Sequence, residues 1–487
     1  MVFSSSVFLF VFLPIVLIVY SIVPGKLQNI WLLLSSLFFY LWGGTQFFPI
    51  IIFSILINYL GGMCLANVQN LRTRKFVLVA FVGLNILNLG YWKYTNFLVD
   101  IIRQITSFEI EMEAIILPIG ISFYTFQGVS YIIDVYRKEV EVQKNPIYVA
   151  LYICLFPQLI AGPIVRYSDI AGEIKNRKRT LDNYEQGIIR FIMGLSKKAI
   201  IANSMGAIAE PIFKAPPTEN TAAIAWIGAI AYSLQIYFDF SGYSDMAIGI
   251  GRIFGFTFPE NFNYPYISKS ITEFWRRWHI SLSSWFRDYI YIPLGGNRCG
   301  KSRQYLNILI TFSVSGLWHG ANWTFLFWGF LHGVYQIIEK ELTPWIRKIN
   351  EKLHTKTESF GYKFTKVMIT FVLVDFAWIF FRAESMKQAL HYIERMIKYR
   401  DWWSLFDQSI YQMGLDVTEI HILALGLLLV LAVELMQYFK RKTFAEFMAE
   451  QWMVFRWISL IAILVVCIVF GYYGPGFNSA QFIYFQF

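Results

Sequence analysis

Long apolar stretches recur from one end of the chain to the other, and each is close to the length that a helix needs to cross a lipid bilayer. About 20 apolar residues in a helix span the roughly 30 Å of hydrocarbon in a typical membrane. The stretches lie, approximately, at 5–23, 28–44, 47–66, 76–98, 115–134, 146–163, 186–212, 222–256, 304–338, 364–384, 419–438 and 453–473. With 304–338 taken as a hairpin, they predict an all-α integral membrane protein of about 11–12 spans.

No internal repeat or Pro/Gly/Ser-rich linker divides these stretches, so we expect one polytopic membrane domain over 1–487, with 261–340 at its core. Pro, Gly and polar residues interrupt the apolar sequence mainly in 115–340. Backbone that leaves the helical conformation at membrane depth must be buried in protein or face water. This middle region is therefore expected to line a cavity.

The formal net charge of +10 comes from basic residues that gather in short clusters at the ends of apolar stretches. The clusters lie at 72–75, 175–179, 298–303, 340–366 and 440–442. Lys and Arg are enriched in cytoplasmic loops, so membrane orientation explains the charge better than nucleic-acid binding does. The four cysteines show neither C-x-x-C nor zinc-ligand spacing, so no metal site or disulfide framework is expected.

The hairpin stretch 304–338 has basic clusters near both ends and His319 near its middle, beside Gly316 and Gly320. Ionisable groups at membrane depth are costly, and they usually serve a substrate path. A neutral imidazole can take the proton of a hydroxyl while that oxygen attacks a thioester carbonyl. We predict that His319 is such a general base; the alternative is a core histidine bonded to a carbonyl across a helix interface.

The segment 261–298 is rich in aromatic and basic residues. Its residues with the spacing of one helix face are Trp275, His279, Leu282 and Phe286, and those of a second face are Arg276, Ser283 and Arg287. This spacing predicts one helix along the cytoplasmic boundary that feeds the cavity, with His279 facing inward. An ordinary interfacial anchor is the alternative.

Polar residues interrupt the apolar stretch 222–256, namely Asp239, Ser241, Tyr243, Ser244 and Asp245. Two carboxylates are compatible with glycosidase chemistry, but nothing in the segment indicates an open cleft for a polysaccharide. We expect these residues to shape a tunnel or to hold a hydroxyl acceptor. A G-x-S-x-G elbow is missing, so the sequence does not support a serine acyl-enzyme.

Residues 295–302 satisfy the pattern G-x-x-x-x-G-K-S, but a P-loop follows a buried strand of an α/β sheet, which this sequence cannot supply. The loop is instead a candidate for binding an acyl donor, coenzyme A or an acidic carrier protein, through Arg298, Lys301 and Arg303. The mixed segment 385–418 is expected to be an amphipathic helix on the outer leaflet or a docking surface for a partner.

Several long motifs are spread over most of the chain: MVFSSSVFLFVFLP at the start, LPIGISFYTFQGVSYIIDVYR at 117–137, PQLIAGPIVRYSDI at 157–170, YFDFSGYSDMAIGIG at 237–251, the whole of 261–298, LWHGANWTFLFWGFLHG at 317–333 and FIYFQF at the end. Together they resemble the membrane-bound O-acyltransferase family, and its alginate O-acetylation branch in particular. The resemblance implies a helical shell around a thin centre with inner and outer funnels, and a catalytic pair at His279 and His319. It departs from many relatives at Asn203, where they have Asp.

The resemblance also implies an activity, the movement of an acyl group, most often acetyl, from a cytoplasmic thioester to a polysaccharide outside a bacterial cytoplasmic membrane. The implied donor is acetyl-CoA or a carrier-protein thioester. The resemblance implies no bound cofactor, and an extracytoplasmic acetyltransferase of the SGNH type (AlgJ- or AlgX-like) as partner. The residues expected to line the substrate tunnel are Asp239, Ser241, Tyr243, Arg277, Trp278, Asp288, Trp318 and Asn322.

Other functions stay open at this point. D-alanyl transfer to teichoic acid and acylation of a lipid or protein are the enzymatic alternatives. A carrier or flippase could also use a polar hairpin, although carriers show broken segments at corresponding positions of two halves, which this sequence lacks. A structural scaffold would not depend on His319.

Overall fold

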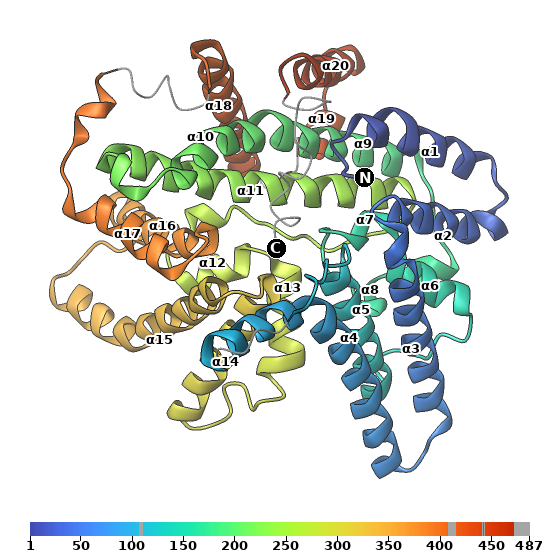
Figure 1. Cartoon of the computed structure of the whole chain (residues 1–487). Helices are drawn as coiled ribbons and strands as arrows, with labels where there is room; N and C mark the ends of the chain where they lie inside the picture. The colour runs from blue at the N-terminus through green and yellow to red at the C-terminus, as the bar shows by residue number, and fades with distance from the viewer. Residues whose placement is uncertain (107–110, 408–414, 441, 443, 472–487) are drawn as a thin grey trace. The chain divides into compact units, whose positions relative to one another are not determined.

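Helices form all the regular structure in the residues that the computed structural model describes, which are 1–106, 111–407, 415–440, 442 and 444–471 (Figure 1). The prediction of an all-α protein is confirmed over this part of the chain. The C-terminal motif FIYFQF and residues 408–414 of the mixed segment lie outside the described residues. The chain divides into two compact units, and the prediction of a single domain stays a prediction.

The first unit holds residues Met1–Leu195 and Tyr243–Pro259. Its helices are α1 (Leu13–Ile22), α2 (Gly25–Leu41), α3 (Phe48–Asn67), α4 (Leu71–Thr106), α5 (Ile121–Arg137), α6 (Pro146–Cys154), α7 (Phe156–Leu159), α8 (Tyr167–Lys175) and α9 (Leu181–Ser196). Aromatic rings of Phe3, Phe8, Phe39 and Phe156 pack together in its core. Such close aromatic packing buries a large apolar area.

The second unit holds Ser196–Gly242 and the described residues from Glu260 onward. Its helices are α10 (Asn203–Lys214), the first part of α11 (Ala222–Ile253), α12 (Ile271–Arg277), α13 (Ile280–Phe286), α14 (Lys301–His319), α15 (Trp323–Lys352), α16 (Phe360–Arg382), α17 (Met386–Lys398), α18 (Val417–Lys440), α19 (Phe444–Ala449) and α20 (Met453–Phe470). A π-helical turn, Lys197–Ala202, precedes α10, and Asn203 is buried directly after it.

Six helices among the described residues are long and apolar enough to cross a membrane: Thr45–Asn67, Leu71–Thr106, Ala222–Ile253, Phe360–Arg382, Val417–Phe439 and Met453–Phe470. The chain is thus a multi-span membrane protein. Other predicted spans appear as shorter or broken helices. The stretch 146–163, for example, is divided between α6 and α7 at Leu155, the residue before Phe156 and Pro157.

The mixed segment 385–418 begins with an amphipathic helix, α17, as the sequence predicts. Its buried face carries Tyr392, whose hydroxyl donates to the carbonyl of Ala225 at 2.9 Å and whose ring stacks on Phe213. Leu390 and Ile397 are exposed on the other side. One face of this helix therefore packs against other helices of the second unit. Its contact with a leaflet or a partner stays a prediction.

Candidate active site

The predicted hairpin is formed by α14 and α15, which pack against each other through small residues. A Cβ atom added to Gly316 would lie 2.2 Å from the carbonyl oxygen of Phe325, and one added to Gly329 would lie 2.2 Å from that of Phe312. Side chains larger than hydrogen would force the two helices apart. The close approach that the sequence predicts at Gly316 is confirmed, and it brings the end of α14 against the start of α15.

His319 is the last residue of α14 and is only 5% exposed. Its imidazole lies among aromatic rings, with centroid distances of 4.9 Å to Trp318, 5.2 Å to Trp328 and 5.2 Å to Phe381 on α16. The ring of His279 lies 6.5 Å away, so the two histidines that the sequence singles out occupy one buried site. Packing against large rigid rings restricts how the His319 imidazole can turn.

The prediction of one continuous helix through His279 is wrong. The chain forms two short helices, α12 and α13, and His279 between them has a left-handed backbone with φ of 43°. The amide of Ile280 donates to the carbonyl of Asn261 at 3.0 Å instead of continuing a helical ladder. A non-glycine residue in this region is strained, and such strain is common at functional sites.

His279 is fully buried, and its Nδ1 lies 3.0 Å from Oδ1 of Asn261. Its ring meets Phe240 edge to face at 4.6 Å and lies 6.2 Å from Trp318. Burial, and to a smaller degree the nearby His319 imidazole, hold the pKa of His279 well below its usual range. With its pKa lowered in this way, the His279 imidazole is neutral at neutral pH. His279 does not belong to any of the six apolar helices that could cross a membrane.

His332 on α15 is a third buried histidine, to which the sequence motifs give no role. The indole nitrogen of Trp275 donates to its Nδ1 at 3.2 Å, and Trp328 packs against its ring. Trp278, one of the predicted tunnel residues, stacks on Phe274 in the same aromatic core. Nδ1 of His332 is therefore paired, whereas its buried Nε2 has no hydrogen-bond partner among the described residues.

Of the predicted polar residues of α11, Asp239 and Ser241 are buried in the second unit. Asp239 forms a buried ion pair with Lys198 at 2.5 Å, next to the Phe240 ring that meets His279. Tyr243 belongs to the first unit, where its ring stacks on Phe3.

The second carboxylate of this stretch, Asp245, pairs with Arg190 at 2.9 Å in the first unit, just as Asp239 pairs with Lys198 in the second. A glycosidase needs one carboxyl group to donate a proton and the other to act as nucleophile or base. Each carboxylate here is engaged by a basic side chain, so the contacts give no support to that chemistry.

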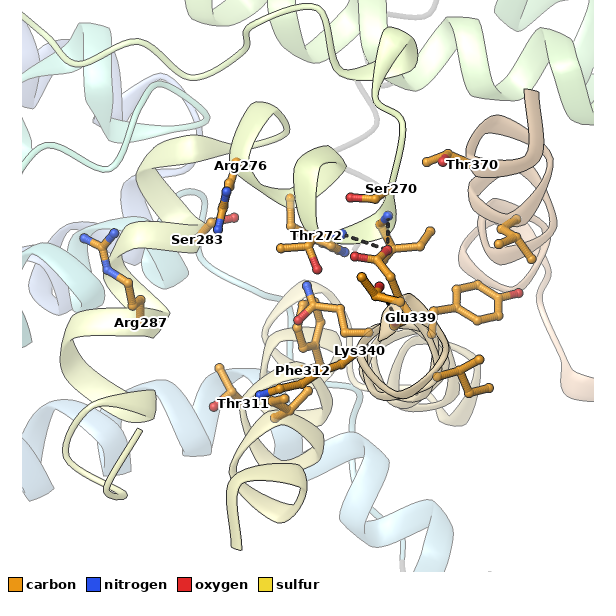
Figure 2. Close-up of a pocket in the computed structure, with 18 of the residues that line it drawn as sticks. Ser270, Thr272, Arg276, Ser283, Arg287, Thr311, Phe312, Glu339, Lys340 and Thr370 are labelled. Carbon is orange, nitrogen blue, oxygen red and sulfur yellow. Dashed lines mark hydrogen bonds between the residues drawn. The ribbon is translucent and has the colours of Figure 1, made fainter. Parts of the chain in front are cut away.

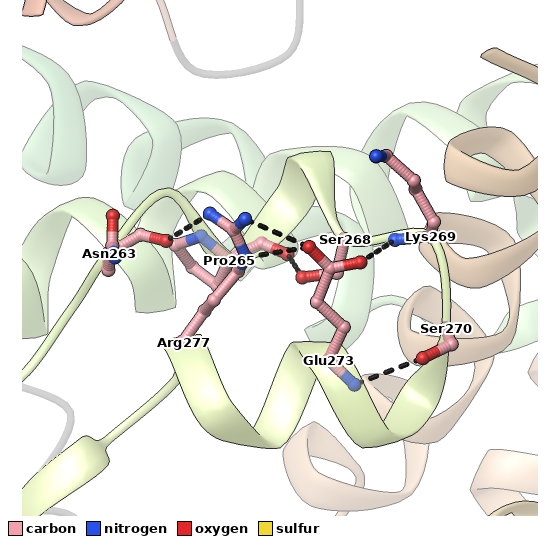
Figure 3. Close-up of polar contacts among 7 residues, drawn as sticks. All are labelled: Asn263, Pro265, Ser268, Lys269, Ser270, Glu273 and Arg277. Carbon is pink, nitrogen blue, oxygen red and sulfur yellow. Dashed lines mark hydrogen bonds and ion pairs between the residues drawn. The ribbon is translucent and has the colours of Figure 1, made fainter. Parts of the chain in front are cut away.

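The remaining tunnel candidates mostly have local structural contacts. Arg277 pairs with Glu273 at 2.8 Å and donates to the carbonyl of Asn263, which closes the turn before α12 (Figure 3). Asp288 pairs with Arg287. Asn322 accepts from the amide of Thr324 and so caps α15, and Trp318 is the one that contacts both histidine rings.

A cavity of about 1230 Å³ opens beside the histidines and is lined by α12, α13, α14, α15 and α16. Five basic side chains and one acidic side chain line it, namely Lys269, Arg276, Arg287, Lys340, Lys366 and Glu339. Figure 2 shows Arg276 and Ser283, on α12 and α13, and Arg287 directly after α13 on one side of the cavity. The carboxylate of Glu339 accepts from the amides of Ile271 and Thr272 at the start of α12. The basic lining favours an anionic ligand.

Neither histidine lines this cavity, but residues next to both of them do. Ile280 follows His279, and Ser315 precedes His319 by one helical turn. The two faces predicted for one helix both reach the cavity, because Trp275, Leu282 and Phe286 line it as Arg276, Ser283 and Arg287 do. The break at His279 turns α13 relative to α12 and brings both sets to the same space.

The loop predicted to bind the donor reaches the cavity through Asn297 and the adjoining Gln304, and its donor role stays a prediction. Arg298, Lys301 and Arg303 are exposed and do not line the cavity, and Lys301 pairs with Glu341. Sequence reasoning missed Lys269, Lys340 and Lys366 as lining residues. Two of them lie in the 340–366 basic cluster, and that cluster was the signal that could have found them. Among the described residues, no group of three or more His, Cys, Asp or Glu side chains could hold a metal ion.

Fold and site define a class: a multi-span helical membrane protein with two buried histidines beside a basic cavity. The sequence model of the membrane-bound O-acyltransferase family matches residues 137–374. The chain is 45% identical over 408 residues to the probable alginate O-acetylase AlgI of Pseudomonas putida, covering 82% of this chain and 81% of that protein. The chain therefore belongs to the membrane-bound O-acyltransferase family and is an O-acyltransferase.

Two other relatives show the range of this similarity. The peptidoglycan O-acetyltransferase of Helicobacter pylori is 35% identical over 429 residues, which is 82% of this chain and 80% of the relative. The teichoic acid D-alanyltransferase of Bacillus subtilis is 31% identical over 276 residues, which is 54% of this chain and 68% of the relative.

Proposed function

We propose that the protein transfers an acetyl group from a cytoplasmic thioester donor to a hydroxyl in the modification of a cell-surface polysaccharide, in the cytoplasmic membrane of a bacterium, with His319 as general base. The observation that carries this proposal is the basic cavity that reaches residues next to both buried histidines. The names of the relatives support the acetyl group and the glycan acceptor, because two that match over most of the chain are a probable alginate O-acetylase and a peptidoglycan O-acetyltransferase.

The cavity suits a thioester donor with phosphate groups. Acetyl-CoA and the phosphopantetheine of a carrier protein both present phosphates, and Lys269, Arg276, Lys340 and Lys366 can neutralise them. Lys340 and Lys366 belong to a basic cluster of the kind found in cytoplasmic loops. We therefore place the mouth of the cavity on the cytoplasmic side, where such donors are made.

The reaction needs one proton acceptor and room for a hydroxyl next to the thioester. The acceptor oxygen attacks the carbonyl carbon while its proton passes to the His319 imidazole, and the carbon–sulfur bond then breaks. The thiolate leaves and takes up the proton, which returns His319 to its neutral form. The aromatic rings around His319 exclude water, which would otherwise hydrolyse the thioester.

The hydroxyl that accepts the acetyl group can belong to the polysaccharide itself or to an extracytoplasmic acetyltransferase of the SGNH type that completes the transfer. Both fit a site that takes a donor from one side of the membrane. D-alanyl transfer is the second candidate, supported by the similarity to the teichoic acid D-alanyltransferase of Bacillus subtilis.

Ester analysis of surface polymers tests this function. Wild type, His319→Ala and the control His391→Ala would be expressed in cells that lack the native protein, at equal membrane levels. His391 is an exposed histidine on α17 in the same unit. Mild base would then release acetate and D-alanine esters from the purified polymers for measurement.

We expect acetate ester to be lost in His319→Ala and retained in His391→Ala. Loss of D-alanine ester instead would replace the acetyl proposal with D-alanyl transfer. If neither ester depended on His319, the role of His319 as base would be refuted and a carrier or scaffold would be favoured.

A further inference from the structure

The turn at His279 is hydrogen-bonded to Asn261, a residue to which the proposed function gives no role. We infer that Asn261 is a positioning residue that fixes the tautomer of His279 and directs its lone pair to Nε2, toward the acceptor hydroxyl. The inference rests on the proposed function, because it concerns how the same site holds its substrate. Asn261 and His279 are 1% and 0% exposed, so their polar atoms must find partners within the protein.

Asn261 contacts the turn at His279 through both its backbone and its side chain. Its carbonyl accepts from the amide of Ile280 at 3.0 Å. Its Oδ1 lies 3.0 Å from Nδ1 of His279 and accepts from the hydroxyl of Ser281 at 2.8 Å. The left-handed turn at His279 is thus stabilised by hydrogen bonds with one residue, Asn261, that is distant from it in sequence.

The amide of Ser281 decides which atom of the Asn261 side chain faces His279. It lies 3.4 Å from Oδ1, and a backbone N–H can only donate, so the oxygen of the side-chain amide occupies this position. An oxygen cannot donate, so Nδ1 of His279 must carry the proton. In a neutral imidazole the other nitrogen, Nε2, then has the lone pair.

The Nε2 atom of His279 is buried and has no hydrogen-bond partner among the described residues. The rings around it are those of Phe240, Trp318 and His319. A hydroxyl that enters beside His319 can donate a hydrogen bond to this lone pair. His279 thus binds the hydroxyl as it enters. For the reaction the single hydrogen of the hydroxyl turns from Nε2 of His279 to the His319 imidazole, which takes the proton as the oxygen attacks.

The charged and titratable groups near His279 leave this assignment intact. His319 on α14 is the titratable group whose ring faces it. On α11, Asp239 adjoins Phe240 and forms an ion pair with Lys198. The hydrogen bond that Nδ1 makes is therefore with the uncharged Asn261.

Substitution of Asn261 tests the inference without knowledge of the donor. Asn261→Ala removes the oxygen that accepts the hydrogen bond from Nδ1 of His279, whereas Asn261→Asp keeps an oxygen at the same place. The matched control is Asn263→Ala, because Asn263 is exposed and contacts Arg277 through its backbone. Acetate ester on the surface polymer would be measured in cells with equal membrane levels of each variant.

We expect the rate of ester formation to fall about 10-fold to 100-fold in Asn261→Ala. Asn261→Asp and Asn263→Ala should keep most of the wild-type rate. In everted membrane vesicles supplied with radiolabelled acetyl-CoA, the acid limb of the Asn261→Asp pH profile should move to higher pH. The carboxylate stabilises the protonated imidazole, so a higher pH is needed to restore the neutral form.

Equal ester formation in Asn261→Ala and Asn263→Ala would overturn the inference, as would loss of activity in Asn261→Asp as severe as in Asn261→Ala. If Asn261→Ala failed to reach the membrane, the Asn261→Asp profile would decide, and an unshifted acid limb would refute the role. If wild type itself formed no ester that depends on His319, the proposed function would fail, and this inference with it.

Discussion

His319 and His279 share one buried site, but different forces hold them. His319 ends a regular helix and is surrounded by Trp318, Trp328 and Phe381, so apolar packing sets its orientation. His279 interrupts a helix, and its Nδ1 donates a hydrogen bond to Oδ1 of Asn261. The hydrogen bond to Asn261 determines which nitrogen of His279 carries the proton as well as where its ring lies. We therefore expect His319 to accept the proton and His279 to bind the acceptor hydroxyl.

The largest expected effect separates these two roles directly. We expect His319→Gln to reduce the rate of acetyl transfer about 10²–10⁴-fold, because glutamine cannot act as a base. His279→Gln should cost less, since an amide oxygen can still accept a hydrogen bond from the hydroxyl. Initial rates in membrane vesicles measure both. Equal losses in the two variants would remove the distinction between the histidines.

The buried ion pair between Lys198 and Asp239, the residue before Phe240, gives a test of polar contacts in this unit. Asp239→Leu leaves the ammonium of Lys198 buried without its carboxylate, and breaking a buried pair in this way costs about 3–5 kcal/mol. The double variant Lys198→Met with Asp239→Leu should recover most of the stability, because it leaves no buried charge. Thermal unfolding in detergent compares them. A double variant as unstable as Asp239→Leu would contradict this account.

The glycine contact in the hairpin tests the apolar support of His319. Gly316→Ala places a methyl group against the backbone of Phe325, and such overpacking costs about 1–3 kcal/mol. The control is Gly361→Ala on α16, where an added Cβ meets nothing within 4 Å. There the change should be neutral or stabilising. Both are measured by thermal unfolding, and a Gly316→Ala protein as stable as the control would refute tight packing at this point.

The smallest expected effects concern the basic cavity that α12 and α15 both line. Arg276→Ala on α12 and Lys340→Ala on α15 should each raise the KM for acetyl-CoA about 10-fold, the value of one hydrogen bond to a charged group, with kcat little changed. Lys301→Ala, outside the cavity, should leave KM unchanged. The reverse result would move the donor site to the loop 298–303 that the sequence pattern favours.

The sequence by itself determined the features that depend on local composition. Apolar stretches of membrane length predict an all-α membrane protein, and the small residues beside His319 in the hairpin predict its burial, because burial and helix packing follow residue type. The motifs also identified the family correctly.

Only the tertiary structure decided how the second histidine is held and where the cavity lies. The spacing of Trp275, His279 and Leu282 fits one helix. The hydrogen bonds that His279 and Ile280 donate to Asn261, 18 residues before His279, outweigh that local preference, and the helix breaks at His279. The basic lining likewise combines residues from α12 and α15, which are distant in sequence. Contacts between distant residues leave no periodic pattern in the sequence, so spacing alone could not predict them.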